Sequence, residues 1–84
     1  MIYMKKILYF SAEWCGPCKQ LGPTMEGLRN QINYTKIDVD QDQESSIKYG
    51  VRNIPTLILL ENGEVKNKLV GNQTVQSIMS FYNG

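Results

Sequence analysis

The sequence reads SAEWCGPC over residues 11–18. This stretch contains both cysteines of the chain, Cys15 and Cys18, and its only tryptophan, Trp14. Residues 2–10, which come before it, are rich in apolar, β-branched and aromatic side chains and predict a strand. The residues that follow have the spacing of a helix, so the cysteines stand where a strand passes into a helix.

A cysteine at the start of a helix has a specific chemistry. Cys15 is predicted at or near the N-cap, where free backbone amides and the helix dipole favour a negative charge. This environment lowers the pKa of a thiol, and the thiolate is the nucleophile. Gly16 leaves the approach to Cys15 open, and Pro17 has the φ angle of a first helical turn. We therefore expect Cys15 to be an exposed nucleophile and Cys18, three residues later, to resolve a mixed disulfide.

Other roles for the cysteine pair are weaker. A structural zinc site usually takes four ligands, and the chain has no histidine and no third cysteine, so only a site shared by a dimer stays open. Covalent haem attachment requires C-x-x-C-H, but Lys19 occupies the last position. A structural disulfide that closes so short a loop constrains little of the unfolded chain. Two inert buried thiols also stay open, although Trp14, Gly16 and Pro17 make a poor core.

The remaining elements are predicted from periodicity and turn signals. One helical face after Cys15 carries Leu21, Met25, Leu28 and Ile32, with Pro23 inside the helix and its end near Asn30. Strands are predicted at residues 34–39, after Pro55, and at 65–70, the last two joined by a hairpin at Asn62-Gly63. Lys66 and Lys68 mark the last strand as an edge strand. A short helix is capped by Asp42 and ends before Gly50, and a final helix is capped by Asn72, with an apolar stripe of Val75, Ile78, Met79 and Tyr82.

This order, β-α-β-α-β-β-α, predicts a single α/β domain over residues 1–84. A right-handed βαβ unit makes the first two strands parallel, and the hairpin makes the last two antiparallel. The expected architecture is a four-stranded mixed sheet with helices on both faces.

Composition sets limits on the function. The chain has 84 residues, nine Lys and Arg against eight Asp and Glu, a net charge of +1 and a hydrophobic fraction of 42%. No basic stripe indicates direct nucleic-acid binding. The apolar run 7–10 is too short for a signal peptide, and no run is long enough to span a membrane, so we expect a cytoplasmic protein. In a reducing compartment a close cysteine pair is more often catalytic or metal-binding than structural.

The chain also resembles the thioredoxin family. AEWCGPCK (residues 12–19) is similar to the active-site signature of that family, and KIDVDQ (36–41), KYGVRNIPTLIL (48–59), NGEV (62–65) and VG (70–71) continue the resemblance. It covers about residues 7–82. The resemblance implies a thioredoxin-like fold in which Cys15 attacks a target disulfide and Cys18 resolves it. It further implies a substrate-binding surface made of Trp14, Gly16, Pro17, Ile54, Pro55 and Gly71, with Pro55 as a cis-proline.

Two departures from the family pattern accompany the resemblance. Full-length thioredoxins have a further strand and helix before this region, so the chain resembles a short, glutaredoxin-sized member. The family also has a buried aspartate six positions before the attacking cysteine, which serves proton transfer to the resolving one. Here Tyr9 stands at that position, while Lys36 matches the usual lysine neighbour of the aspartate. Tyr9 and Lys36 are therefore possible modulators, and water, a substrate carboxylate or Glu13 are candidates to accept the proton.

The function implied is reduction of protein disulfides by dithiol–disulfide exchange, with an external flavoenzyme of the thioredoxin reductase type as electron donor. We expect no bound cofactor other than the Cys15–Cys18 disulfide, no metal, and a monomer. Since no histidine lies between the cysteines, a reductant is favoured over an oxidant. A glutathione-coupled, glutaredoxin-like reductant and a non-redox accessory subunit with the same fold are the alternatives.

Overall fold

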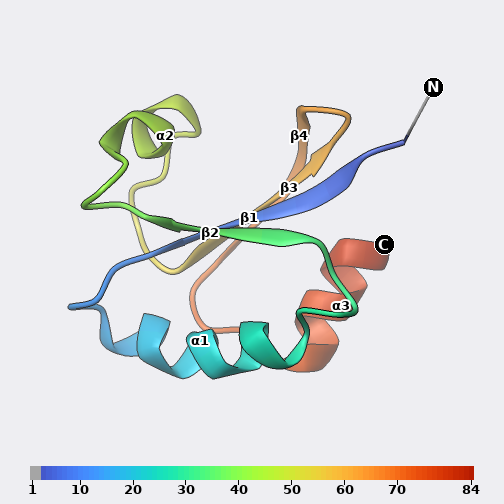
Figure 1. Cartoon of the computed structure of the whole chain (residues 1–84), viewed down its shortest axis with the longest axis horizontal. Coiled ribbons are helices and arrows are strands. Elements are labelled where there is room, and N and C mark those ends of the chain that lie inside the picture. Colours follow the sequence, from blue (N-terminus) through green and yellow to red (C-terminus); the bar gives the residue numbers. More distant parts are fainter. Residues whose placement is uncertain (1–2) are drawn as a thin grey trace.

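The computed structural model describes residues 3–84, so Ile2 of the predicted first strand lies outside the described residues. Seven elements follow the chain (Figure 1). They are β1 (Lys5–Ser11), α1 (Gly16–Gly27), β2 (Tyr34–Asp38), α2 (Gln43–Lys48), β3 (Thr56–Glu61), β4 (Glu64–Val70) and α3 (Val75–Asn83). The predicted order β-α-β-α-β-β-α is confirmed.

The strands form one mixed sheet in the order β2-β1-β3-β4. β1 pairs in parallel with β2, while the β1–β3 and β3–β4 pairs are antiparallel. α1 and α3 cover one face of the sheet and α2 lies on the other (Figure 1). β4 is an edge strand on which Lys66 and Lys68 are exposed, in agreement with the charge pattern.

The core has two layers because side chains alternate across the sheet. Ile7, Tyr9 and Leu57 face α1 and α3, where they meet Leu21, Met25 and Ile78. Leu8, Phe10 and Ile58 face the opposite side, where Tyr49, Val51 and Ile54 pack against them. The centre of β1 is therefore covered on both faces, and the end of this strand carries the cysteine motif.

Capping and turn signals explain most element ends. Asp42 caps α2 through the backbone N–H of Ser45, and Gly50 follows α2 with a φ of 65°, as predicted. Asn62 and Gly63 have φ of 52° and 85°, the positive values that a two-residue hairpin turn needs. The backbones of Asn62 and Met4 are also joined, since the Asn62 N–H donates to the Met4 carbonyl at 2.7 Å.

The predicted end of α1 was wrong by one turn. The helix ends at Gly27, and Leu28 is its C-cap, rather than near Asn30. Leu28 and Ile32 nevertheless remain buried in the same cluster as Leu21 and Met25. The apolar spacing thus continued past the last helical residue because the turn that follows packs on the same face.

The predicted start of α3 was also wrong. Its N-cap is Thr74, whose side chain accepts from the Ser77 N–H at 3.1 Å, and not Asn72. The segment before α3 is bonded to the loop before β3 and does not join the helix, because the Gly71 N–H donates to the Pro55 carbonyl at 2.8 Å. The buried stripe shifts accordingly. Ile78 and Phe81 are buried and Met79 and Tyr82 half-buried, whereas Val75 is 51% exposed.

Candidate functional site: the Cys15–Cys18 dithiol

The cysteine motif occupies the turn between the end of β1 and the start of α1. Cys15 and Cys18 are joined by a disulfide, with their Cα atoms 5.2 Å apart. Cys15 is the N-cap of α1, as predicted, and its Sγ accepts from the backbone N–H of Cys18 at 3.2 Å. Gly16 and Pro17 form the first turn of the helix. An N–H aimed at Sγ favours a negative charge on that sulfur once the disulfide is reduced.

The dithiol is more enclosed than the sequence indicated. Cys15 is 5% exposed and Cys18 3% exposed, so the expectation of an exposed Cys15 was wrong for the disulfide form. Both pack with Ala12, and Ile54 and Val39 adjoin this cluster. Gly16 and Pro17 are exposed beside them. Gly16 and Pro17 are therefore the exposed residues of the segment that connects the two buried cysteines.

The loop before β3 brings the second part of the predicted site to the dithiol. Cys15 Sγ lies 3.7 Å from the carbonyl oxygen of Ile54. The Ile54–Pro55 peptide bond is cis, as the resemblance implied. Pro55 itself is fully buried, so this residue presents no side-chain surface to a partner. Gly71, with a φ of 93°, is joined to this loop through the Pro55 carbonyl.

Trp14 extends the site in the direction of α2. Its side chain is 68% exposed, and its indole Nε1–H donates to Asp40 Oδ2 at 2.7 Å. Reasoning from the sequence did not find this partner. Asp40 lies two residues after the end of β2, and Trp14 lies shortly after the end of β1. Because β1 and β2 are parallel, their carboxyl ends meet at the same edge of the sheet. The predicted parallel pairing could therefore have indicated that Trp14 and Asp40 lie close together.

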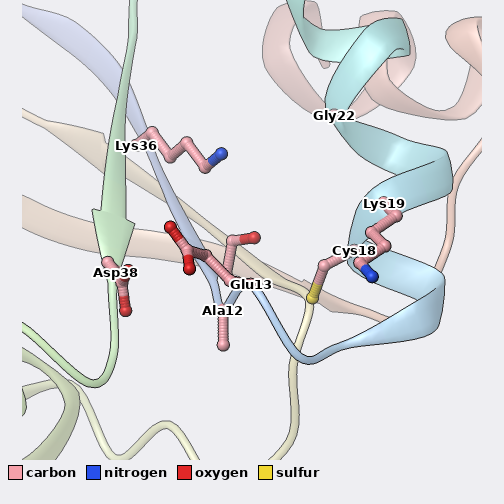
Figure 2. Close-up of a pocket in the computed structure, with 8 residues that line it drawn as sticks. Ala12, Glu13, Cys18, Lys19, Gly22, Lys36 and Asp38 are labelled. Atoms are coloured by element: carbon pink, nitrogen blue, oxygen red, sulfur yellow. The ribbon is translucent and has the colours of Figure 1, made fainter.

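A pocket of about 420 Å³ lies on the other side of the motif and reaches Cys18. Figure 2 shows Lys36 and Asp38 on β2 facing Cys18 and Lys19 on α1 across this pocket, with Glu13 from the connecting turn between them. Gly22, Ala12 and Ser11 complete its lining. Exposed Glu13 and Lys19 border it, so the pocket gives Cys18 a route to solvent. No pocket had been predicted.

Tyr9 and Lys36 lie together beneath α1. Lys36 Nζ is 6.0 Å from the centroid of the Tyr9 ring. The Tyr9 hydroxyl donates to the backbone carbonyl of Cys18 at 3.1 Å. Of the two residues at the positions of the family's aspartate and lysine, Tyr9 thus contacts the first turn of α1, and Lys36 lies near the Tyr9 ring and lines the pocket beside Cys18.

Two further properties bear on cofactors and membranes. Within residues 3–84, no three His, Cys, Asp or Glu side chains are grouped so that they could hold a metal ion. In the same part of the chain, no helix has the length and apolar character needed to cross a bilayer.

Comparison with known proteins places these features in one family. The Thioredoxin family model matches residues 3–83. Thioredoxin of Bacillus subtilis is 42% identical over 78 residues, which are 88% of this chain and 75% of the relative. Thioredoxin of Rickettsia typhi is 38% identical over 81 residues, 92% of this chain and 77% of the relative.

Solved structures agree with the family match. A mutant thioredoxin from Halobacterium salinarum superposes with a TM-score of 0.89 at 38% identity, covering 94% of this chain and 72% of that one. Fasciola hepatica thioredoxin superposes with a TM-score of 0.87 at 28% identity, covering 94% and 78%.

Proposed function

This chain belongs to the thioredoxin family and is a thiol–disulfide oxidoreductase, and we propose that it acts as a protein-disulfide reductase through Cys15 and Cys18. The observation that carries the proposal is the disulfide at the N-terminus of α1, with Cys15 Sγ accepting from the Cys18 N–H. That arrangement supports Cys15 as the thiolate and Cys18 as its resolving partner.

The reaction has two exchange steps. The Cys15 thiolate attacks one sulfur of the target disulfide, forming a Cys15–target bond and releasing the other target sulfur as a thiolate. Cys18, after losing its proton, attacks Cys15 Sγ and releases the second target thiolate. Two electrons pass to the target, and the protein ends with the Cys15–Cys18 disulfide.

The proposed docking surface is the exposed turn Gly16-Pro17 together with Trp14, Ile54 and Gly71, and Pro55 contributes to it only through its backbone. The backbone of the loop that carries Ile54 suits an extended peptide that reaches the dithiol, because the Ile54 carbonyl oxygen lies only 3.7 Å from Cys15 Sγ. The wide exposure of Trp14 suits a protein partner rather than a small molecule.

The proposal also covers the direction of electron transfer and the protein that supplies the electrons. The residues between the cysteines are Gly16 and Pro17, and neither carries a charge that stabilises the reduced thiolate. A reductant is therefore favoured, regenerated by a flavoenzyme of the thioredoxin reductase type. We propose that no cofactor or metal takes part beyond the dithiol, and that the protein works as a cytoplasmic monomer.

Insulin reduction by dithiothreitol tests this function. The intact protein is expected to accelerate precipitation of the insulin B chain, because Cys15 attacks the insulin disulfides. The Cys15→Ser variant is expected to lose this acceleration, and Cys18→Ser to accumulate a mixed disulfide visible by mass spectrometry. No acceleration by the intact protein would contradict the proposal.

A second assay separates two sources of electrons. NADPH with thioredoxin reductase is expected to sustain insulin reduction, and glutathione with glutathione reductase is expected to do so poorly. Reduction supported by glutathione alone would assign the chain a glutaredoxin-like role instead.

A further inference from the structure

Tyr9 is held rigidly beneath the first turn of α1. It is 1% exposed at the centre of β1, and its ring contacts Tyr34 edge-on at a centroid distance of 6.3 Å. Lys36 Nζ lies over the same ring. The hydroxyl reaches the Cys18 carbonyl at 3.1 Å, in a buried hydrogen bond between residues nine apart in the chain. The direction of this donor is therefore set by packing.

The acceptor of this bond belongs to a peptide group that also holds Cys15. The Cys18 carbonyl and the Lys19 N–H form one peptide unit, and the Lys19 N–H donates to the Cys15 carbonyl at 3.2 Å. The Cys18 N–H donates to Cys15 Sγ at 3.2 Å. Tyr9 thus anchors to the sheet the same backbone segment that connects the two cysteines.

This turn needs an anchor from outside the helix. Pro23 lies four residues after Lys19 and has no N–H, so the Lys19 carbonyl receives no helical hydrogen bond from it. The hydrogen-bond ladder of α1 is therefore weakened close to Cys18, and the Tyr9 hydroxyl adds a bond at that place.

We propose that Tyr9 is a positioning residue for the resolving step, holding Cys18 at the distance and angle from which it attacks Cys15 Sγ. This role rests on the proposed function of the dithiol. Tyr9 does not accept the Cys18 proton, because its hydroxyl donates to a carbonyl and it does not line the pocket beside Cys18. The pocket beside Cys18 offers this proton a path to solvent.

The two exchange steps can be observed separately with the aromatic disulfide DTNB. Cys15 attack releases one thionitrobenzoate and leaves the other bonded to Cys15. Cys18 attack on Cys15 Sγ then releases the second thionitrobenzoate and forms the Cys15–Cys18 disulfide. Two electrons pass from the dithiol to DTNB. Stopped-flow absorbance follows both releases. The second release is intramolecular and independent of DTNB concentration, whereas the first becomes faster in excess DTNB, so the two rates can be separated.

In Tyr9→Phe, which keeps the ring and the Lys36 contact, the second release is expected to slow about fivefold while the first is unchanged. Tyr49→Phe, the same change on the opposite face of the sheet, is expected to alter neither. Equal second-release rates in Tyr9→Phe and the unmodified protein would overturn the proposal. Equal slowing of both releases would overturn it too, since Tyr9 would then act on the whole helix start.

A second variant tests the same proposal if Tyr9→Phe folds poorly. 3-Fluorotyrosine at position 9 retains both ring and hydroxyl and is a stronger hydrogen-bond donor, so the second release is expected to match or exceed the normal rate. A slower second release would overturn the proposal. Failure of the proposed function gives a different result, because the intact protein would then not accelerate insulin reduction, whatever its rates with DTNB.

Discussion

The residue at position 17 lies next to the reactive sulfur and outside the core, so a charged side chain there can act on the sulfur without disturbing the packing. Pro17 is exposed and lies between the two cysteines. A histidine there is protonated over part of the range near neutral pH and attracts the Cys15 thiolate. The reduced form gains from this attraction and the disulfide does not, so the redox balance of the site depends on this one side chain.

Pro17→His is accordingly expected to raise the reduction potential by about 30 mV or more, a tenfold shift in equilibrium constant. Equilibration with glutathione redox buffers, followed by alkylation and mass spectrometry, measures the potential. Pro17→Ala is the matched control, since it removes the ring without adding charge. Equal potentials in the two variants would contradict the charge-based explanation.

Some of the site could be predicted residue by residue and some could not. The N-cap position of Cys15 followed from a strand-to-helix junction, which is a local property of the chain. The Tyr9–Cys18 and Trp14–Asp40 hydrogen bonds join residues that meet only after the sheet has formed. Local patterns contain no information on such partners, and the burial of Cys15 by Ile54 and Val39 was missed for the same reason.

At the scale of elements, the helix cap was predicted correctly before α2 and wrongly before α3. Asp42 is the observed cap of α2, while Asp40, two residues earlier, accepts from the Trp14 indole instead. Before α3, however, both Asn72 and Thr74 are capping residue types. Thr74 caps the helix because Gly71 is bonded to Pro55 and Gln73 donates to the Val70 carbonyl, which holds residues 71–73 outside the helix.

This assignment leads to a paired test of α3. Thr74→Ala is expected to lower the free energy of unfolding by about 1 kcal/mol, because the Ser77 N–H loses its acceptor. Asn72→Ala, an exposed change two residues away, is expected to stay within about 0.5 kcal/mol. Urea unfolding followed by circular dichroism measures both. A larger loss of unfolding free energy in Asn72→Ala than in Thr74→Ala would indicate that Asn72 is the cap.

The α2 cap also makes stability depend on pH. Hydrogen bonds from the Ser45 hydroxyl and N–H hold the pKa of the Asp42 carboxyl below its ordinary value. A pKa depressed by folding gives stability that is present above the unfolded pKa, about 3.9, and is lost as the pH falls through the folded value. The hydrogen bond and charge of Arg29 also lower the pKa of Glu26. Glu26 therefore adds to the loss of stability at low pH, which is the acid limb of the stability curve.

Asp42→Asn keeps an acceptor for the Ser45 N–H but removes the titration. The acid limb of its stability curve is therefore expected to be shallower below about pH 5 than that of the unmodified protein. Urea midpoints measured across this range provide the comparison, with Glu64→Gln on the exposed hairpin as the control. Parallel acid limbs for Asp42→Asn and the unmodified protein would exclude this origin.

At the scale of the whole molecule, a small sheet depends on a few fully enclosed side chains. Domains of this size bury only about 60% of the surface that their unfolded chains expose. Leu57, in β3, is completely buried between the sheet and the two helices α1 and α3. Ile47, on α2, is a side chain of the same size that is 80% exposed.

Leu57→Ala is expected to cost about 2–5 kcal/mol of unfolding free energy, since it leaves a cavity in the α1–α3 layer. Ile47→Ala is expected to change stability by less than about 0.5 kcal/mol. Chemical denaturation of both variants makes the comparison. Similar losses would mean that α2 is more enclosed in solution than its exposure indicates.

The fold as a whole was the most predictable level. The βαβ unit and the Asn62-Gly63 hairpin follow from period, turn chemistry and handedness, and together they leave little choice of strand order. The exposed position of Val75 was not predictable, because an apolar stripe identifies a helical face but does not indicate where the sheet beneath it ends.

The hydrogen bonds between Met4 and Asn62 have a practical consequence for handling the protein. They fix the beginning of the described chain to the β3–β4 hairpin, at the opposite end of β1 from the dithiol. Seven residues of strand separate the two ends, about 20 Å at 3.3 Å per residue. A dye or solid support attached to the β3–β4 hairpin therefore leaves the sulfurs accessible, whereas attachment through Lys19 would block the pocket beside Cys18.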